Sequence, residues 1–335
     1  MKLLLKNARE RKGLKTREVA QLLGIDQALI SKFESGTRKP TKDQISKLAK
    51  LLEIDLETLM IAWLKEKILY EIGDEEFALK ALILAEQEIQ KNKKETNSII
   101  ISSFQTILDE IEILKNKIQS FNHFELRQIS KTLELEFIFK SIFLNGNPLT
   151  MEETKLVIND GLTINGKSMH NHLEAINFQE TILYIKDLSQ KKTALNEKEF
   201  LFIHNLIFRG IESENSGKYK NDLLITREMN LFFNWYESHK NNIHPIILAA
   251  EAHLKILEIN PFETGNLQMA HLTLNWILLQ NNYTYTSIEG NQNSITEYFS
   301  VLEESKIKND KSIFIHYILR IEKQNLKRAV QLSEK

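Results

Sequence analysis

Three side chains in the C-terminal half have types suited to metal or acid–base chemistry, namely His253, Glu258 and His271. His253 and Glu258 lie five positions apart, a spacing that does not place two side chains on one face of a helix. The sequence contains no His-x-x-x-His pair, the helical spacing that binds zinc. Cysteine is absent, which excludes thiolate zinc sites, disulfides and cysteine nucleophiles. We therefore expect structural histidines, and neither a metal nor another cofactor.

Binding to phosphates depends on charge, and the charge of this chain is unevenly distributed. The whole sequence of 335 residues has a net charge of −1. Residues 1–65 contain ten Lys and four Arg against eight Asp and Glu, a net charge of +6. The rest of the chain has 30 Lys and Arg against 37 Asp and Glu, a net charge of −7. A small basic segment beside a larger acidic one indicates two domains, of which the first contacts nucleic acid.

The basic segment is expected to form five short helices, because its apolar residues recur at helical spacing. Thr16 is the expected N-cap of the second helix, and Gly24 its C-cap. The third helix is expected to begin after Asp26 and to end at Gly36. The five predicted helices span 3–13, 16–23, 27–35, 44–53 and 56–63.

The run LKTREVAQLLGIDQALISKFESGTRKPT, residues 14–41, resembles the repressor-type (XRE family) helix-turn-helix in residue type and spacing. The resemblance implies that the helix over residues 27–34 lies in the major groove of DNA. Only that groove admits a helix and displays a distinct pattern for each base pair. The resemblance also implies that four apolar residues lock this helix to the preceding one, namely Leu22, Ile25, Ile30 and Phe33.

The same resemblance assigns outward-facing side chains to DNA. Gln27 can pair with adenine, and Ala28 can contact a thymine methyl group. Ser31 and Lys32 can reach base edges or phosphates. Four further residues are placed to hold the phosphate backbone, namely Arg17, Thr37, Arg38 and Lys39. The alternative interpretation is that the basic residues form a solvated face, or that the domain contacts another protein.

The segment that follows, residues 66–106, is interpreted as a helical linker with the polar stretch QKNKKETN between two helical runs. An apolar stripe from Ile99 to Ile118 spans about three heptads and either packs on the C-terminal domain or pairs two chains. Alternation around LLIT, residues 223–226, predicts one short β-hairpin. No stretch approaches the roughly 18 apolar residues of a membrane span, and the first residues do not resemble a signal peptide. We therefore expect a cytoplasmic protein that does not enter a membrane.

A second resemblance covers residues 107–325 and is to the Fic (Fido) family, all-helical transferases that typically move AMP from ATP to a protein hydroxyl. It implies a Fic-like domain over residues 107–335. Residues 218–220 would lie at the edge that aligns a target protein in that family. The segments that carry the resemblance are ILDEIEILKNKI, NGNPLTMEETKLVINDGLTINGKSMHNHLEAINFQETILYI, LFIHNLIFRGI, SGKYK and HPIILAAEAHLKILEINPFETGNLQMAHLTLNWILL.

The family signature HPFx(D/E)GNGRxxR corresponds here to NPFETGNLQMAH, which begins at Asn260. Asn260 replaces the histidine that accepts the proton of the target hydroxyl, and an amide is not a base near neutral pH. Thr264 replaces the acid that holds magnesium, and Leu267 replaces the glycine that lets the loop close around phosphates. Gln268 and His271 replace two arginines, the first of which clamps the terminal phosphates. The residues that remain shape the loop: Pro261, Phe262, Gly265 and Asn266.

The family's inhibitory helix has the pattern (S/T)xxxE(G/N), which corresponds here to SIFLNG. Ser141 is kept, but Asn145 replaces the glutamate that pairs with the phosphate-binding arginine in the family. Both partners of that ion pair are therefore missing. This resemblance implies a catalytically silent domain, a pseudoenzyme rather than an enzyme.

These observations predict an all-α protein, in which a five-helix repressor-type bundle precedes an all-helical Fic domain with one short β-hairpin. The low content of 11 Gly and 4 Pro is typical of long helices. The expected function is sequence-specific regulation of transcription by a homodimer on double-stranded DNA. The Fic-like domain would supply dimerisation, ligand sensing or a surface for a protein partner. The alternatives are an active nucleotidyl transferase with an altered motif, and an antitoxin-like autorepressor that binds a partner protein.

Overall fold

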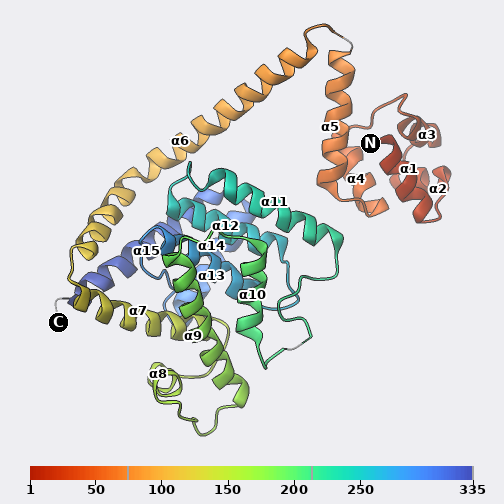
Figure 1. Cartoon of the computed structure of the whole chain (residues 1–335). Coiled ribbons are helices and arrows are strands. Elements are labelled where there is room, and N and C mark those ends of the chain that lie inside the picture. The colour runs from red at the N-terminus through yellow and green to blue at the C-terminus, as the bar shows by residue number, and fades with distance from the viewer. Residues whose placement is uncertain (74, 213, 334–335) are drawn as a thin grey trace. The chain divides into compact units, whose positions relative to one another are not determined.

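The computed structural model describes residues 1–73, 75–212 and 214–333, with the side chains of residues 57 and 86–103 left out. The chain divides into two compact units, Met1–Thr96 and Asn97–Lys335 (Figure 1). Each unit has its own apolar core. The units are therefore described separately.

The first unit contains five helices and the start of a sixth. Its core includes the fully buried side chains of Val19, Ile30, Phe33, Leu48 and Leu59. The helices α2 and α3 pack against each other, and α1 and α4 cover them. The bounds are α1 Lys2–Arg11, α2 Thr16–Leu23, α3 Gln27–Ser35, α4 Lys42–Leu52 and α5 Leu56–Ile72.

Local capping signals place the ends of α2 and α3. Gly24 ends α2 and Gly36 ends α3, with left-handed φ angles of 64° and 82° that glycine adopts without strain. Asp26 caps α3 by accepting a hydrogen bond from the backbone N–H of Ala28 at 2.6 Å. The expected N-cap of α2 is wrong, because Thr16 is the first helical residue and Lys15 precedes the helix.

Two further expectations for this unit need correction. Leu22 was expected to lock α2 to α3, but 62% of it is exposed. The buried face of α2 is formed by Val19 and Ala20, and Leu22 falls beside that face. The fifth helix is longer than expected, since α5 continues to Ile72. It continues because residues 64–72 are helix-forming and contain neither Gly nor Pro.

The boundary between the units falls inside one helix, α6 (Ala78–Gln119). The helix runs through the polar stretch QKNKKETN, which was interpreted as a linker, and the boundary between the two units, after Thr96, lies within this stretch. This stretch lacks Gly and Pro and is rich in Lys, Gln and Glu, which are good helix formers. Polarity alone therefore did not mark a break in this helix.

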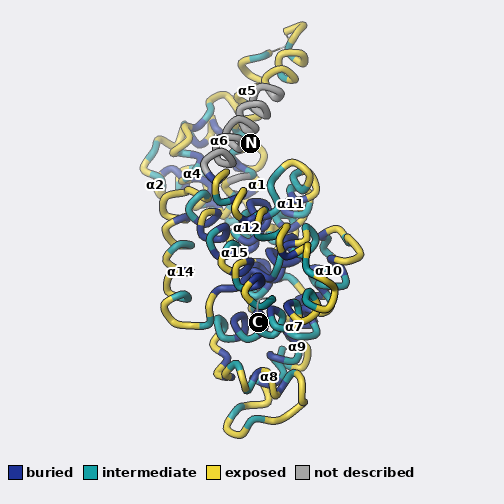
Figure 2. The backbone as a smooth tube through the Cα atoms, turned by 90° about the vertical axis from the view of Figure 1, so that its left-hand side faces the viewer, coloured by how far each residue is buried: buried dark blue, intermediate teal, exposed yellow. Residues whose placement is uncertain are grey.

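The second unit is an assembly of helices around α12 and α13. The helix α12 packs against α13, α11 and α15, and α13 also packs against α9. Buried residues gather around α12, while α14 has many exposed ones (Figure 2). The bounds are α7 His123–Leu144, α8 Met151–Asp160, α9 Met169–Gln190, α10 Glu197–Phe208, α11 Leu223–His239, α12 Pro245–Ile259, α13 Asn266–Gln280, α14 Gln292–Ile307 and α15 Lys311–Ser333.

The expected β-hairpin around residues 223–226 is wrong. These residues form the first turn of α11, and residues 1–73, 75–212 and 214–333 include no strand. The side chain of Asp222 accepts a hydrogen bond from the backbone N–H of Leu224 at 2.8 Å. This N-cap starts a helix where the short apolar run alone resembled a strand. In the same described ranges, no helix is long and apolar enough to cross a membrane.

Candidate functional site

The outer face of α3 brings together the four side chains that sequence assigns to base edges. Gln27, Ala28, Ser31 and Lys32 are all exposed, while Ile30 and Phe33 on the opposite face are buried at 2% and 1%. The side-chain amide of Gln27 donates a hydrogen bond to the Thr16 hydroxyl at 3.3 Å. The sequence thus presents a short polar surface on a helix whose other side is fixed in the core.

The four residues expected at phosphates divide into two groups. Arg17, Thr37 and Arg38 are exposed beside α3, and the backbone N–H of Arg38 donates to the Lys32 carbonyl at 3.2 Å. Lys39 instead faces α5. Its ammonium donates to the Glu66 carbonyl at 2.9 Å and lies 4.2 Å from the centre of the Tyr70 ring. A phosphate contact by Lys39 would have to replace these intramolecular contacts.

One ion pair that positions α3 was not foreseen. The guanidinium of Arg9 on α1 donates to Glu34 on α3 at 2.6 Å, with each side chain only about one-tenth exposed. This hydrogen bond raises the pKa of Arg9. The pair joins residues 25 positions apart, so no local sequence pattern could have indicated it.

In the second unit, the residues that match the Fic signature form a tight loop between α12 and α13. Asn260 ends α12 in a left-handed conformation with φ of 51°. Asn266 begins α13 and closes the loop from inside. Its side-chain oxygen accepts from the Phe262 N–H at 2.9 Å, and its amide donates to the Phe262 carbonyl at 2.7 Å. Asn266, which the sequence shares with the Fic signature, therefore holds the backbone of the loop.

The core side of this loop rests on His204 from α10. The rings of His204 and Phe262 stack with centroids 3.7 Å apart. The backbone N–H of Gly217 donates to Nδ1 of His204 at 2.9 Å, so the proton lies on Nε2, which donates to the Thr264 carbonyl at 3.1 Å. Burial lowers the pKa of His204 to about 4, which keeps the ring neutral. We had assigned no role to His204 from sequence.

Lys220 is hydrogen-bonded to the first residues of the loop. Its backbone N–H donates to the Pro261 carbonyl and its ammonium donates to the Asn260 carbonyl, both at 2.9 Å. Tyr219 lies against Phe262, with ring centroids 5.4 Å apart. The segment expected to dock a target is thus hydrogen-bonded to Asn260, the residue that the resemblance aligns with the catalytic base.

At the position of the family's metal-binding acid, Thr264 donates a hydrogen bond to a carboxylate oxygen of Glu212 at 3.1 Å. Glu212 follows α10, and its other oxygen accepts from Asn215 at 3.2 Å. Within the part of the chain that the structure describes, no group of three or more His, Asp or Glu side chains could hold a metal ion. Mg²⁺ is usually held by one or two carboxylates together with waters and substrate phosphates, so the carboxylate of Glu212 is the group at this position that would hold such an ion.

The first turns of α13 carry no positive charge. Leu267 packs partly buried against the core, and Gln268 is neutral. Nδ1 of His271 donates to the Leu267 carbonyl at 3.1 Å, and burial lowers the pKa of His271 to about 4. The His271 ring is therefore neutral and lies in the interior, where its centroid is 4.8 Å from that of His253.

The other titratable candidates, His253 and Glu258, lie on different faces of α12. His253 is completely buried and its Nε2 lies 3.0 Å from the Tyr298 hydroxyl, whereas Glu258 is exposed. The two side chains thus lie on different faces of α12, as their five-residue spacing predicts. Their arrangement is that of a structural histidine and a solvated glutamate.

The segment that matches the inhibitory pattern ends α7. Ser141 is buried, and the Asn145 side-chain amide donates to the Ser141 carbonyl at 2.8 Å. The amide of Asn145, which the resemblance aligns with the family glutamate, thus caps its own helix. Immediately beyond it, the Asn147 amide donates to Glu174 at 2.7 Å and to the Asn171 carbonyl at 3.0 Å.

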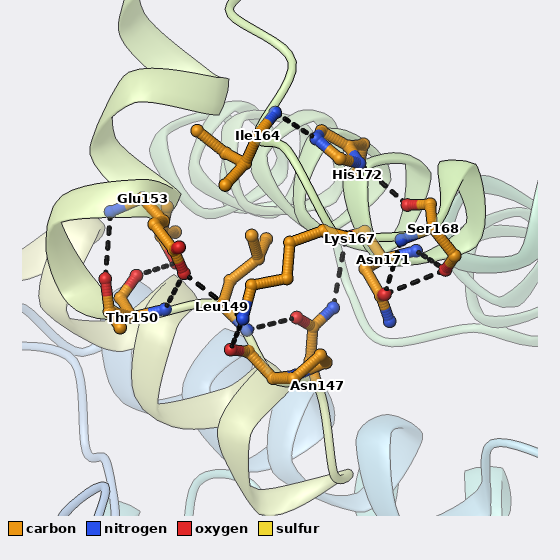
Figure 3. A network of polar contacts seen from close by, with 11 residues as sticks. Asn147, Leu149, Thr150, Glu153, Ile164, Lys167, Ser168, Asn171 and His172 are labelled. Atoms are coloured by element: carbon orange, nitrogen blue, oxygen red, sulfur yellow. Dashed lines mark hydrogen bonds and ion pairs between the residues drawn. The ribbon is translucent and has the colours of Figure 1, made fainter.

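Figure 3 shows how the polar contacts continue from Asn147 across the loop between α8 and α9. Both nitrogens of His172 are used, since Nε2 accepts from the Ile164 N–H at 2.8 Å and Nδ1 donates to the Ser168 carbonyl at 2.7 Å. Lys167 donates to the Pro148 carbonyl and pairs with Glu153 at 3.5 Å. This network fixes the loop, and its buried groups have partners within it.

We predict that Gly265→Ala strongly destabilises the second unit. A Cβ atom at residue 265 would lie 2.3 Å from Cε2 of Phe208, and the residue has φ of 81°. Left-handed strain and overpacking together should lower the free energy of unfolding by roughly 2–5 kcal/mol. Gly166→Ala is the matched control, because Gly166 has φ of 79° but no atom within 4 Å of the added Cβ. Equal losses in urea unfolding of the two variants would contradict the steric account.

Comparison with known families agrees with both resemblances. Residues 5–59 match the helix-turn-helix family model, and residues 194–278 match the Fic/DOC family model. Similar curated proteins include Protein adenylyltransferase Fic of Drosophila melanogaster, 23% identical over 248 residues that cover 69% of this chain and 49% of that protein. The Drosophila virilis protein of the same name is 27% identical over 210 residues, covering 58% and 42%. The chain thus spans about half the length of the curated relatives it matches.

Two solved structures share the fold. A Fic domain containing signaling protein from Bacteroides thetaiotaomicron has a TM-score of 0.63 and 22% identity, covering 68% of this chain and 97% of that one. Fic-1 from C. elegans has a TM-score of 0.65 and 15% identity, covering 99% and 92%. These structures show the fold alone, whereas the family models show that the chain combines a helix-turn-helix domain at residues 5–59 with a Fic/DOC domain at residues 194–278.

Proposed function

We propose that this protein is a sequence-specific DNA-binding regulator of transcription whose Fic-like domain does not transfer nucleotides. The observation that carries the proposal is the exposed face of α3 in a segment with a net charge of +6. Gln27 and Ala28 would contact adenine and a thymine methyl group, and Lys32 a base edge or phosphate. Arg38 would fix the register on the backbone.

The catalytically silent Fic-like domain is supported by the chemistry of the loop. Asn260 supplies an amide in place of a base, and its carbonyl accepts from Lys220. Gln268 and the neutral His271 supply no charge for a phosphate. This domain, proposed to span residues 107–335, would serve assembly or partner binding. A groove of about 450 Å³ beside Lys218, lined also by Tyr184 and Phe202, is a surface where the protein partner of an antitoxin-like autorepressor would dock.

One contact favours a second candidate function. Glu212 lies beside Thr264, so a carboxylate is present near the position of the missing acid. An active transferase with an altered motif would use this carboxylate in place of the family's acid. The two candidates differ in whether a labelled nucleotide is incorporated into protein.

The test of DNA binding compares two single variants of the full-length chain. Lys32→Ala should relax the preference for the bound sequence by roughly 1–3 kcal/mol of discrimination if Lys32 reaches a base. Arg38→Ala should weaken binding to all sequences and reduce the salt dependence by about one phosphate contact. Fluorescence anisotropy with a selected and a random duplex measures both effects. Parent-like binding by both variants would show that the groove assignment is wrong.

A further inference from the structure

The sequence contains two asparagines that are followed directly by glycine, Asn145 and Asn165. In such a pair the backbone nitrogen of the glycine can attack the side-chain amide carbon of the asparagine, because glycine has no Cβ to obstruct the approach. Attack within one chain is fast when the two groups can reach each other and slow when the fold holds them apart. The surroundings of the two pairs therefore decide whether either of them reacts.

The first pair is held by the end of α7. The side-chain amide of Asn145 donates to the Ser141 carbonyl at 2.8 Å, and its backbone N–H donates to the Ile142 carbonyl at 3.1 Å. The backbone N–H of Gly146, whose nitrogen would have to make the attack, donates to the Phe143 carbonyl at 2.9 Å. Both reacting groups are thus engaged, and an attack must first break their hydrogen bonds.

The second pair lies in the loop that joins α8 to α9, whose residues are mostly exposed (Figure 2). Asn165 and Gly166 are both exposed, and among the described residues no hydrogen bond engages the Asn165 side chain or the Gly166 N–H. A long backbone hydrogen bond crosses the pair, from the Lys167 N–H to the Ile164 carbonyl at 3.3 Å. A Cβ atom added at Gly166 would have no atom within 4 Å. Both reacting groups are therefore free, and the space around them is open.

The contacts on either side of this second pair hold the loop without covering the pair. The Ile164 N–H donates to Nε2 of His172 at 2.8 Å, and the Lys167 ammonium pairs with Glu153 at 3.5 Å (Figure 3). Exposed loop segments open locally at little cost in free energy. A reaction at Asn165 can therefore proceed in the folded protein, while α8 and α9 stay intact.

We propose that Asn165 is a site of spontaneous chemical modification, at which the side-chain amide is lost as ammonia while Asn145 keeps its own. Hydroxide removes the proton from the Gly166 nitrogen, which then bonds to Cγ of Asn165. The bond between Cγ and Nδ2 breaks, and the nitrogen leaves as ammonia after taking a proton from water, which restores the hydroxide. Water then opens the resulting succinimide at either carbonyl and gives aspartate or isoaspartate. The loop thereby gains a negative charge.

Peptide mapping of the incubated full-length chain measures the two sites separately. Trypsin cleaves after Lys140, Lys155 and Lys167, which places Asn145 and Asn165 on different peptides. In folded protein held at pH 8, Asn165 should lose its amide roughly 5- to 30-fold faster than Asn145, the factor expected when one or two hydrogen bonds must break first. Equal loss at the two sites, or faster loss at Asn145, would overturn the proposal.

The same incubation in urea separates the effect of the fold from that of the local sequence. In the unfolded chain the two pairs should lose their amides at similar rates, because the hydrogen bonds around Asn145 are gone. A difference that persists unchanged in urea would assign the protection of Asn145 to its neighbours in sequence, and the proposal would then be wrong.

Asn165→Gln is the matched variant, because it keeps the amide and adds a methylene group that lengthens the ring to be closed. The folded parent should accumulate a more acidic species during incubation, seen by anion-exchange chromatography, and Asn165→Gln should lose most of it. Asn145→Gln should accumulate the acidic species as the parent does. Undiminished accumulation in Asn165→Gln would contradict the assignment of the site to Asn165.

Discussion

Labelled ATP incubated with the full-length chain and magnesium should leave no labelled protein, and Asn260→His should not change that result. General-base help contributes roughly 10²- to 10⁴-fold to a rate, so a histidine at residue 260 restores one contribution only. Nucleotide transfer depends chiefly on positioning and on charge stabilisation of the phosphates. Gln268 is neutral, and burial keeps His271 neutral by lowering its pKa to about 4.

The comparison variant for this assay restores the family residues in the altered motif. A chain rebuilt with the family residues at positions 260, 264, 267, 268 and 271 should show at most a trace of incorporation. GTP, UTP and CTP, with magnesium or manganese, extend the test to other nucleotides. Robust labelling by the parent that is lost in Glu212→Gln would contradict the pseudoenzyme proposal, because the carboxylate beside Thr264 would then be required.

Acid should destabilise the second unit before its exposed carboxylates are protonated. Burial lowers the pKa of His271 to about 4 and also lowers the pKa of His253 well below its ordinary value. Between pH 6.5 and 4 the unfolded chain therefore binds more protons than the folded one, and the free energy of unfolding falls as the pH falls. At about 1.4 kcal/mol for each pKa unit, His271 alone accounts for about 3 kcal/mol over this window.

Glu322 has the opposite effect on the pH dependence of stability, so it serves as a comparison for His271. Burial raises the pKa of Glu322 to about 7, so its contribution to stability is present at low pH and is lost as the pH rises through 7. His271→Gln should reduce the loss of stability between pH 7.5 and pH 4.5, whereas Glu322→Gln should increase it and raise stability at pH 7.5 by about 3 kcal/mol. Urea unfolding followed through the fluorescence of buried Trp276 measures both. Shifts of the same sign would contradict this account.

Local chemistry made the helix ends of the first unit predictable. Asp26, Gly24 and Gly36 act through their own backbone or a neighbour two residues away, so their effect is visible in a short window of sequence. The failure at Leu22 had a different origin. The short helix α2 has apolar residues on more than one face, and only tertiary packing shows that Val19 is buried and Leu22 is exposed.

The sequence predicted which residues form the Fic-like loop, but it did not predict the distant residues that hold the loop in place. Pro261, Phe262 and Asn266 could be placed because the motif is contiguous. His204 stacks on Phe262 from 58 positions earlier, and Lys220 reaches Asn260 from 40 positions earlier. Such contacts depend on which helices become neighbours, and a single sequence does not contain that information. The segment at 223–226 shows the converse, since a side-chain cap at Asp222 decided between helix and strand.

Selection of bound duplexes from a random pool by the full-length chain tests the central claim most directly. We expect a short two-fold symmetric sequence to be enriched. A variant with Ala at Gln27, Ser31 and Lys32 should lose that enrichment while keeping its salt-dependent affinity for random duplex. Absence of any enriched sequence with the parent chain, or enrichment of the same sequence by the variant, would contradict the account of α3 as the helix that reads DNA.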